Sequence, residues 1–346
     1  VQNAVDAARA EGADLVVAVA HLGIDETSSP WTSSEVIANT TGIDALIDGH
    51  SHSIVGTKVL NKDGKPVVHS QTGTKLNNIG QITISADGSR IEACLISNYT
   101  GRDAEMEAFI ADIKAKFEAV LKEVVAKTDV DLITVDPETN ERIIRNAETN
   151  LGDLCSDAYR IVSGADVAFV NGGGIRADIP AGDVTYEQII AVHPYGNMLT
   201  VVEATGQQIL DCLEYGVHSW PAEFGGFLHA SGITYEIHTY IESGVSRDED
   251  GMFAGVEGEY RIKNVMVNGE PLDLNKTYTV ASHNYMLKQG GDGFNMFQGN
   301  VILQNEVMLD NQVLITYIRD SLGGTVGEEY GDIYGQGRMT FVTEKP

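Results

Sequence analysis

The feature that most constrains the fold of this chain is an apolar run, Val167 to Val170, which ends in Asn171 and three glycines followed by Ile175 and Arg176. A short, continuous apolar run is typical of a strand that is buried on both faces. Glycine adopts positive φ angles freely and lets a backbone approach a ligand closely. The amide of Asn171 and the guanidinium of Arg176 are thus placed to contact a nucleotide-sized ligand. An alternative stays open, in which the segment is a tight turn and Arg176 pairs with a surface carboxylate.

Histidines follow two further apolar runs near the start of the chain. His21 comes directly after the run 15–20, and His50 and His52 come shortly after the run 45–47. Both runs predict parallel strands covered on both faces, and open α/β sheets bind ligands at the carboxyl ends of such strands. Imidazole is a good ligand for zinc and related metals. The three histidines therefore predict a metal site, although a core or surface histidine with a purely structural role remains the alternative for each.

The middle of the chain predicts hairpins and then one long helix. Short strands at 65–71, 79–85 and 91–97 alternate with Asp-Gly turns at 63–64 and 87–88, which indicates hairpins that complete a sheet. Apolar residues then recur at helical spacing over 103–127. We expect this amphipathic helix to pack against the domains on either side of it. The predicted division is residues 1–100, a linker helix at 101–127 and a second domain at 128–346.

The second domain is predicted to mix helices and strands without strict alternation. A helix begins near Thr149, and capping boxes at Thr185 and Thr205 open two more. The pair Asn268-Gly269 predicts a hairpin between the strands 262–267 and 278–282. The 346 residues are enough for two domains with sizeable cores.

The charge balance narrows the class of partner. The chain has 23 Lys and Arg against 50 Asp and Glu, for a net charge of −27. Such acidity argues against a nucleic-acid polymer or an anionic membrane as partner. No apolar stretch is long enough for a transmembrane helix. A phosphate ester would be repelled unless bound cations or a local arginine cluster reversed the sign of the field.

Four motifs resemble those of one enzyme family. Residues 171–176 resemble the Asn-Gly-Gly-Gly-Ile-Arg motif in the C-terminal domain of the 5'-nucleotidases, a family that includes UDP-sugar hydrolases. Further matches follow in the family's order at 148–153, 194–197 and 290–294. The resemblance implies an α/β and α+β fold: the C-terminal part of a calcineurin-like metallophosphoesterase sandwich, a long linker helix, and a mixed α+β substrate-binding domain.

The resemblance also implies a nucleoside site in the second domain. Its parts would be two aromatic rings that sandwich the base, a carboxylate that accepts from ribose hydroxyls, an amide that reads the base edge, and two arginines around the ribose and phosphate. In that order these are Tyr195 and Tyr285, Asp292, Asn171, and Arg145 and Arg176. Stacking on an aromatic side chain contributes about 1–3 kcal/mol per base.

The histidines resemble the last two motifs of the dinuclear metallophosphoesterases. The resemblance implies that His21 and His50 bind one divalent metal ion and His52 the other, with zinc or manganese as the metal. The first three motifs of that superfamily, Asp-x-His, Gly-Asp-x-x-Asn/Asp and Gly-Asn-His-Glu, do not precede these histidines. We therefore expect the catalytic residues to lie upstream of Val1, and the chain alone to be inactive as a phosphatase.

The resemblance implies a secreted, cell-wall or periplasmic enzyme that hydrolyses nucleoside 5'-monophosphates, with UDP-sugars as a further substrate class. Two metal ions would activate a water for in-line attack on the phosphoryl group. Two alternatives stay open. One is a 2',3'-cyclic nucleotide phosphodiesterase of the same superfamily, and the other is a nucleotide-binding module without catalysis.

Overall fold

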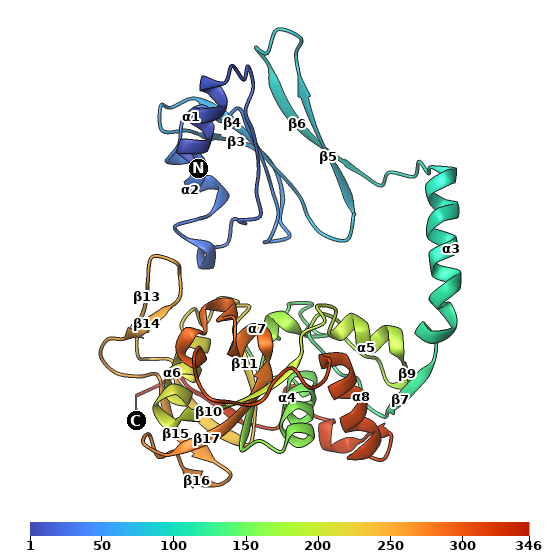
Figure 1. Ribbon diagram of the computed structural model, residues 1–346, viewed down its shortest axis with the longest axis vertical. Helices are drawn as coiled ribbons and strands as arrows, with labels where there is room; N and C mark the ends of the chain where they lie inside the picture. Colours follow the sequence, from blue (N-terminus) through green and yellow to red (C-terminus); the bar gives the residue numbers. More distant parts are fainter. Residues whose placement is uncertain (346) are drawn as a thin grey trace. The chain divides into compact units, whose positions relative to one another are not determined.

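Two units make up the computed structural model, Val1–Ile110 and Ala111–Pro346, and the structure describes residues 1–345 (Figure 1). The first unit has a four-stranded sheet in the order β1-β2-β4-β3, in which β1, β2 and β4 are parallel and β3 is antiparallel to β4. The elements of this unit are α1 (Gln2–Ala10), β1 (Val17–Val19), α2 (Ser33–Ala38), β2 (Ala45–Asp48), β3 (Ile54–Leu60), β4 (Pro66–Thr72), β5 (Asn78–Ile84) and β6 (Ile91–Ser97).

The strand β1 is covered on one face only, so the prediction that residues 15–20 are buried on both faces is wrong. Ala18 packs against the small core of this unit, whereas Val17 is 43% and Val19 is 82% exposed. Alternate side chains of a strand point to opposite faces, and β1 lies at the edge of its sheet. The apolar run specifies a strand but not what lies over its second face.

The hairpins form at the predicted turns but not in one sheet. β3 and β4 pair across the turn at Asp63-Gly64, and β5 and β6 pair across the turn at Asp87-Gly88. Among residues 1–345, β5 and β6 pair only with each other, so the prediction that they complete the main sheet is wrong. Turn residues set the local hairpin, whereas the choice of sheet depends on contacts distant in sequence.

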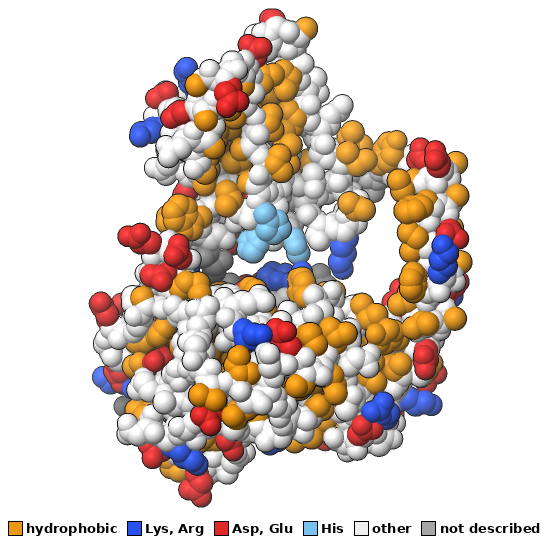
Figure 2. Space-filling view, viewed as in Figure 1, with side chains coloured by type: hydrophobic (Ala, Val, Ile, Leu, Met, Phe, Trp, Pro, Cys, Tyr) orange, Lys and Arg blue, Asp and Glu red, His pale blue; other side chains and the backbone are white. Residues whose placement is uncertain are grey.

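Helix α3 (Ala104–Leu121) is shorter than the predicted helix over 103–127, because the residues from Val124 onward form the strand β7 (Val124–Thr128). None of its residues is buried, and Figure 2 shows hydrophobic side chains along its surface. The exposed apolar residues are Met106, Phe109, Ile110, Ile113, Phe117 and Val120. Helical spacing predicted which side chains share a face, and the apolar side chains of that face are exposed. No helix within residues 1–345 is both long and apolar enough to cross a membrane.

The second unit is built on a five-stranded mixed sheet in the order β11-β8-β17-β10-β18. Only β8 and β17 run parallel to each other, and the other neighbouring pairs are antiparallel. The further elements are α4 (Asn150–Ser163), β8 (Val167–Asn171), β9 (Gly182–Thr185), α5 (Tyr186–Val192), β10 (Leu199–Thr205), α6 (Gly206–Gly216), β11 (Leu228–Ser231), β12 (Ile233–His238), β13 (Val245–Arg247), β14 (Phe253–Val256), β15 (Ile262–Val267), β16 (Glu270–Pro271), β17 (Thr277–His283), α7 (Asn284–Leu287), β18 (Ile302–Gln304), α8 (Asp310–Asp320), β19 (Thr325–Val326) and β20 (Met339–Val342).

The strand β8 explains why its sequence is apolar without a break. Ala168 and Val170 face one hydrophobic core, which includes residues of α4, α5 and α8. Val167 and Phe169 face a second core on the other side, which includes residues of α6, β12 and β15. Both faces of the strand are therefore covered, as predicted, and the chain stays buried through Gly172, Gly174 and Ile175. This arrangement delivers Asn171 and the glycine loop to one edge of the sheet.

Local helix signals were predicted well in this unit, but one strand pairing was not. Thr149 caps α4, and Thr185 and Thr205 form capping boxes at α5 and α6. The predicted hairpin at Asn268-Gly269 does not join the strands 262–267 and 278–282. Instead β15 pairs with the two-residue strand β16, and β17 lies in the five-stranded sheet. The turn was correct, but the second strand ends too soon to carry the pairing further.

A buried cluster of charges joins the start of α4 to the segment before β20. Arg338 donates to the carboxylate of Asp157 at 2.6 Å and lies 3.5 Å from that of Asp153. Glu148 accepts hydrogen bonds from the backbone N–H groups of Gln336, Arg338 and Met339. A single cation thus faces several buried carboxyl groups. Because burial and neighbouring like charges disfavour ionisation of every one of them, one carboxyl group is expected to keep its proton.

Replacing Asp153 with asparagine is expected to remove a pH dependence of stability. Burial raises the pKa of Asp153 to about 8, against the attraction of Arg338 and with help from Glu148. Since the unfolded carboxyl group has a pKa near 3.8, its contribution to folding is complete below that pH and is lost as the pH rises toward about 8. The unfolding free energy of the wild type should fall by about 1–3 kcal/mol relative to Asp153→Asn between about pH 5 and pH 8. Urea unfolding at both pH values measures this, and a constant difference would contradict it.

Candidate functional site

The glycines after β8 lie against two other loops of the second unit. The backbone N–H of Gly172 donates to the carbonyl of Phe227, and that of Gly173 donates to the carbonyl of Gly225, both at 2.7 Å. A Cβ atom at Gly172 would overlap the carbonyl oxygen of Ile144. So close an approach of two backbones requires glycine. The loops around residues 144, 172 and 225 are thereby held together at one edge of the sheet.

Asp292 presents its carboxylate to the same place. It accepts a hydrogen bond from Nδ2 of Asn171 at 2.6 Å and one from the hydroxyl of Tyr285 at 3.0 Å. The φ angle of Asp292 is 55°, between Gly290 and Gly293, whose φ angles are also positive. Non-glycine residues seldom adopt this conformation, and those that do are often found at functional sites. The loop therefore fixes a carboxylate in a strained but well-bonded position.

Two tyrosines lie in this region, Tyr285 bonded to the Asp292 carboxylate and Tyr195 beside Arg176. Tyr195 is 60% exposed, and the guanidinium carbon of Arg176 lies 5.9 Å from the centre of its ring, within the range of a cation–π contact. Tyr285 is half-buried, with its ring directly over Gly291. Burial and the Asp292 carboxylate raise the pKa of Tyr285, and Tyr195 acts in the same direction. The two aromatic rings thus belong to one cluster.

The backbone also connects the segments that carry the two tyrosines. Asn284, the residue before Tyr285, accepts a hydrogen bond from the N–H of Met198 at 2.9 Å through its side-chain oxygen. Its own backbone N–H donates to the carbonyl of Met198 at 2.8 Å. This reciprocal pair of hydrogen bonds fixes the start of α7 against the end of the 194–197 loop.

The guanidinium of Arg145 has a buried N–H group that is not used in a hydrogen bond within residues 1–345. Burial lowers its pKa to about 10, and repulsion from Arg142 and Arg176 adds to the effect. Its Nε atom is buried and has no hydrogen-bond partner among residues 1–345. Arg142, in contrast, forms an ion pair with Glu223. A partly desolvated guanidinium of this kind is suited to bind an anionic group bidentately.

The structure brings all six predicted ligand residues of the second domain into one cluster. An exposed aromatic ring and a half-buried one can stack on a planar base. A carboxylate that already accepts two hydrogen bonds can accept more from hydroxyl donors. The guanidinium groups of Arg145 and Arg176 supply positive charge in an acidic protein. Asn171, predicted to read the base edge, is 5% exposed and has both polar atoms of its amide hydrogen-bonded within the protein.

Three residues of the cluster were not named from the sequence. His283 hydrogen-bonds to Asn171, Gly225 lies beside Asp292, and Glu223 pairs with Arg142. The pair Gly225-Gly226 is a sequence signal for close backbone approach that could have been used. Nothing in the sequence links His283 to Asn171, because 112 positions separate them.

The three histidines that were predicted to bind metal lie in the first unit, and they do not form a complete metal site there. The rings of His21 and His50 meet edge to face with centroids 5.2 Å apart, at the carboxyl ends of β1 and β2. His50 and His52 have positive φ angles, and all three histidines are exposed. Within residues 1–345 no group of three or more His, Cys, Asp or Glu side chains is placed to hold a metal ion. Two neighbouring imidazoles fit a transition metal in chemistry but fall short of a complete ligand set.

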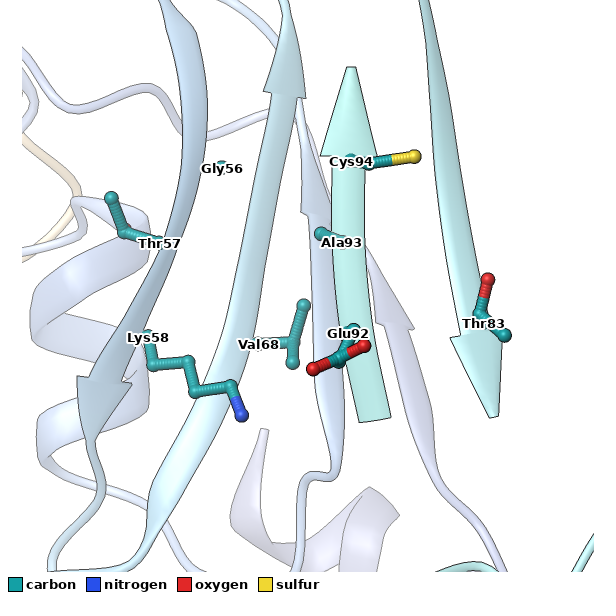
Figure 3. Close-up of a pocket in the computed structure, with 8 residues that line it drawn as sticks. All are labelled: Gly56, Thr57, Lys58, Val68, Thr83, Glu92, Ala93 and Cys94. Atoms are coloured by element: carbon teal, nitrogen blue, oxygen red, sulfur yellow. The ribbon is translucent and has the colours of Figure 1, made fainter. Parts of the chain in front are cut away.

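A cavity of about 490 Å³ in the first unit contains none of the predicted site residues. It is lined by β3 and β4 on one side and by β5 and β6 on the other (Figure 3). Its lining residues are Gly56, Thr57, Lys58, Val68, Thr83, Glu92, Ala93 and Cys94. The cavity is open and offers one cation and one carboxylate, so it shows no arrangement for a nucleotide.

Comparison with known proteins decides the family. Residues 124–299, just over half of the chain, match the family described as 5'-nucleotidase, C-terminal domain. The chain belongs to the 5'-nucleotidase family. The matched segment contains every residue of the cluster from Arg145 to Asp292. The resemblance predicted from four short motifs is therefore confirmed.

The similar proteins agree with this assignment. A trifunctional nucleotide phosphoesterase protein of Bacillus subtilis is 28% identical over 86% of this chain and 20% of its own length. A cell wall protein of Listeria monocytogenes is 26% identical over 90% of this chain and 41% of its own length. The crystal structure of a 5'-nucleotidase precursor from Thermus thermophilus superposes with a TM-score of 0.73 at 27% identity, over 99% of this chain and 67% of that one. The chain thus spans less than half the length of these two curated relatives, and its mixed α and β fold matches a 5'-nucleotidase over nearly its whole extent.

Proposed function

We propose that the second unit binds nucleoside 5'-monophosphates, and that the whole protein hydrolyses them to nucleoside and phosphate, with UDP-sugars as a further substrate class. The observation that carries the proposal is the cluster of two tyrosines, the Asp292 carboxylate and the partly desolvated Arg145 in a single unit. Each part matches one part of a nucleotide: the rings match the base, the carboxylate the ribose hydroxyls, and the cation the phosphate.

The first unit is proposed to be the C-terminal part of a metallophosphoesterase sandwich. Two divalent metal ions, zinc or manganese, would polarise the phosphoryl group and supply an activated water when bound. His21 and His50 would contribute imidazoles to one ion and His52 to the other. These three imidazoles do not amount to a complete ligand set for two metal ions. A secreted, cell-wall or periplasmic location is proposed from the similarity to a cell wall protein.

Replacing Tyr195 with alanine is expected to weaken adenosine binding about tenfold, because one of the two aromatic rings proposed to stack on the base is lost. Isothermal titration calorimetry of residues 1–346 with adenosine, without added metal, measures the change. Tyr195→Phe is the matched control, since it keeps the aromatic face and should bind nearly as well as the wild type. Failure of the folded wild type to bind adenosine, or equal binding by Tyr195→Ala, would refute the nucleoside site.

Two alternative functions predict different products. A 2',3'-cyclic nucleotide phosphodiesterase would consume 2',3'-cyclic AMP in preference to AMP when the full-length protein is supplied with metal. A binding module without catalysis would consume neither, although adenosine would still bind. Profiling both substrates by chromatography separates the three possibilities.

A further inference from the structure

The hydrogen bonds around His283 determine which of its nitrogens carries the proton. Nδ1 lies 3.2 Å from the backbone N–H of Met286, and this N–H can only donate. Nδ1 must therefore be an acceptor without a proton, and the neutral ring carries its proton on Nε2. Burial lowers the pKa of His283 to about 4, so the ring is neutral at physiological pH. The Nε2–H group points at Asn171, 2.8 Å away.

This tautomer determines the orientation of the Asn171 amide. Because Nε2 of His283 donates, the atom of Asn171 that faces it must be Oδ1. The other end of the amide, Nδ2, then lies 2.6 Å from Oδ2 of Asp292, where only a donor is acceptable beside a carboxylate. The backbone N–H of Met286 and the carboxylate of Asp292, at the two ends of this chain of hydrogen bonds, therefore require the same orientation of the Asn171 amide. The amide has no second orientation that satisfies both neighbours.

The second oxygen of Asp292 is held in an equally definite way. The hydroxyl of Tyr285 accepts from the backbone N–H of Asp292 at 3.1 Å, so its proton is directed to Oδ1 at 3.0 Å. Each carboxylate oxygen therefore accepts one hydrogen bond from the protein. Since a carboxylate oxygen has two lone pairs, each keeps one acceptor position for a ligand. Two neighbouring acceptor positions match two hydroxyl groups on adjacent carbon atoms.

We propose that His283 is a positioning residue which, through Asn171, holds the Asp292 carboxylate ready for a pair of adjacent hydroxyl groups and so makes the site selective for ribonucleosides. This inference rests on the proposed function, in which Asp292 faces the ribose. His283 itself is 2% exposed and acts only through its neighbour. The selectivity arises because an unpaired carboxylate or amide is costly in a partly buried site.

Two substitutions at position 283 separate this role from a merely structural one. His283→Asn places an acceptor where Nδ1 stands and can still cap α7, but it lacks a donor at the Nε2 position. His283→Gln places a donor at the Nε2 position but loses the cap. The proposal predicts that His283→Asn lowers the preference for adenosine over 2',3'-dideoxyadenosine about tenfold, chiefly by weakening adenosine binding. His283→Gln should keep that preference while lowering the unfolding temperature.

The experiment is a calorimetric titration of the wild type and both variants of residues 1–346 with the two nucleosides. A wild-type preference retained in His283→Asn, or lost equally in both variants, would overturn the proposal. A general structural defect would weaken both nucleosides alike and leave their ratio unchanged. The affinity for the dideoxy ligand therefore measures the base contacts alone, and the additional affinity for adenosine measures the contacts of its hydroxyl groups with the Asp292 carboxylate.

A measurement on the free protein keeps the inference separate from the proposed function. Long-range proton–nitrogen correlation NMR assigns histidine tautomers, and the His283 signals are identified by their absence from His283→Asn. We expect a proton on Nε2 and a bare Nδ1. The opposite tautomer would overturn the chain of hydrogen bonds even if adenosine binds. If the tautomer is as expected but the wild type binds no adenosine, the nucleoside proposal fails and the claimed selectivity fails with it.

Discussion

Replacing Arg338 with methionine is expected to lower the unfolding free energy of the second unit by about 3–5 kcal/mol. Arg338 is 9% exposed and is the cation that faces the buried carboxyl groups of Asp153 and Asp157. Its guanidinium also donates to the carbonyl of Ala230 at 2.8 Å and to the side chain of Gln336. Without the guanidinium, the buried carboxylate of Asp157 loses its partner while remaining largely out of contact with water. Removing one member of a buried ion pair is costly for this reason.

The matched control for this prediction is Arg319→Met. Arg319 is paired with Asp320 on the exposed surface of α8, where an ion pair contributes little. We expect its loss to change the unfolding free energy by less than about 0.5 kcal/mol. Urea unfolding followed by circular dichroism measures both variants, and Arg338→Lys provides a folded intermediate case if the methionine variant does not fold. Equal stability of Arg338→Met and wild type would show that the charge cluster contributes nothing.

The same cluster shows why a motif can be found in a sequence without its role being understood. The segment 148–153 was recognised by its resemblance to the family, and Thr149 was predicted correctly to begin a helix. The structure shows that Glu148 and Asp153 bind the backbone and side chain of a segment about 190 residues later. No spacing rule connects residues so far apart. Local signals, such as caps and turns, were predictable because their physics lies within a few residues.

The candidate site also has parts that short sequence segments predict and parts that depend on contacts between distant residues. The glycine loop, Tyr195 and Asp292 could be named because each stands in a short segment with its own distinctive residues. Their convergence could be expected only through the family resemblance. The environment of Asn171 could not be expected at all, since its amide is occupied by Asp292 and His283 from distant parts of the chain. Burial of this kind is decided by the packing of β8 within the sheet.

Exposure was the least predictable property. The apolar residues of β1 and of α3 were expected to be covered, yet Val19 is 82% exposed and no residue of α3 is buried. A sequence pattern shows which side chains lie on one face of an element. It carries no information on whether another element of the same unit lies against that face. The strand β8, with a core on each side, is the case in which the same pattern was interpreted correctly.

Replacing Arg145 with methionine is expected to weaken AMP binding by about 2–3 kcal/mol, roughly 30- to 150-fold, while adenosine binding changes much less. The difference arises because the phosphate is the group that AMP has and adenosine lacks. Charge-assisted hydrogen bonds in a partly desolvated site are among the stronger polar interactions. Calorimetric titration of residues 1–346 with both ligands measures the two affinities.

The control for this prediction is Arg142→Met, which removes the same charge from the same cluster. Arg142 is paired with Glu223, so its loss should weaken AMP binding less than about threefold if hydrogen bonding rather than net charge decides affinity.

The two variants should also differ in stability. Burial lowers the pKa of Arg145, with repulsion from its arginine neighbours in support, so the folded protein opposes this charge and Arg145→Met should unfold at an equal or higher temperature. A residue whose removal costs ligand affinity without costing stability is retained for binding. Weak AMP binding by both variants would instead mean that the cluster acts only through its summed charge, and a fall in stability would mean that Arg145 serves the fold.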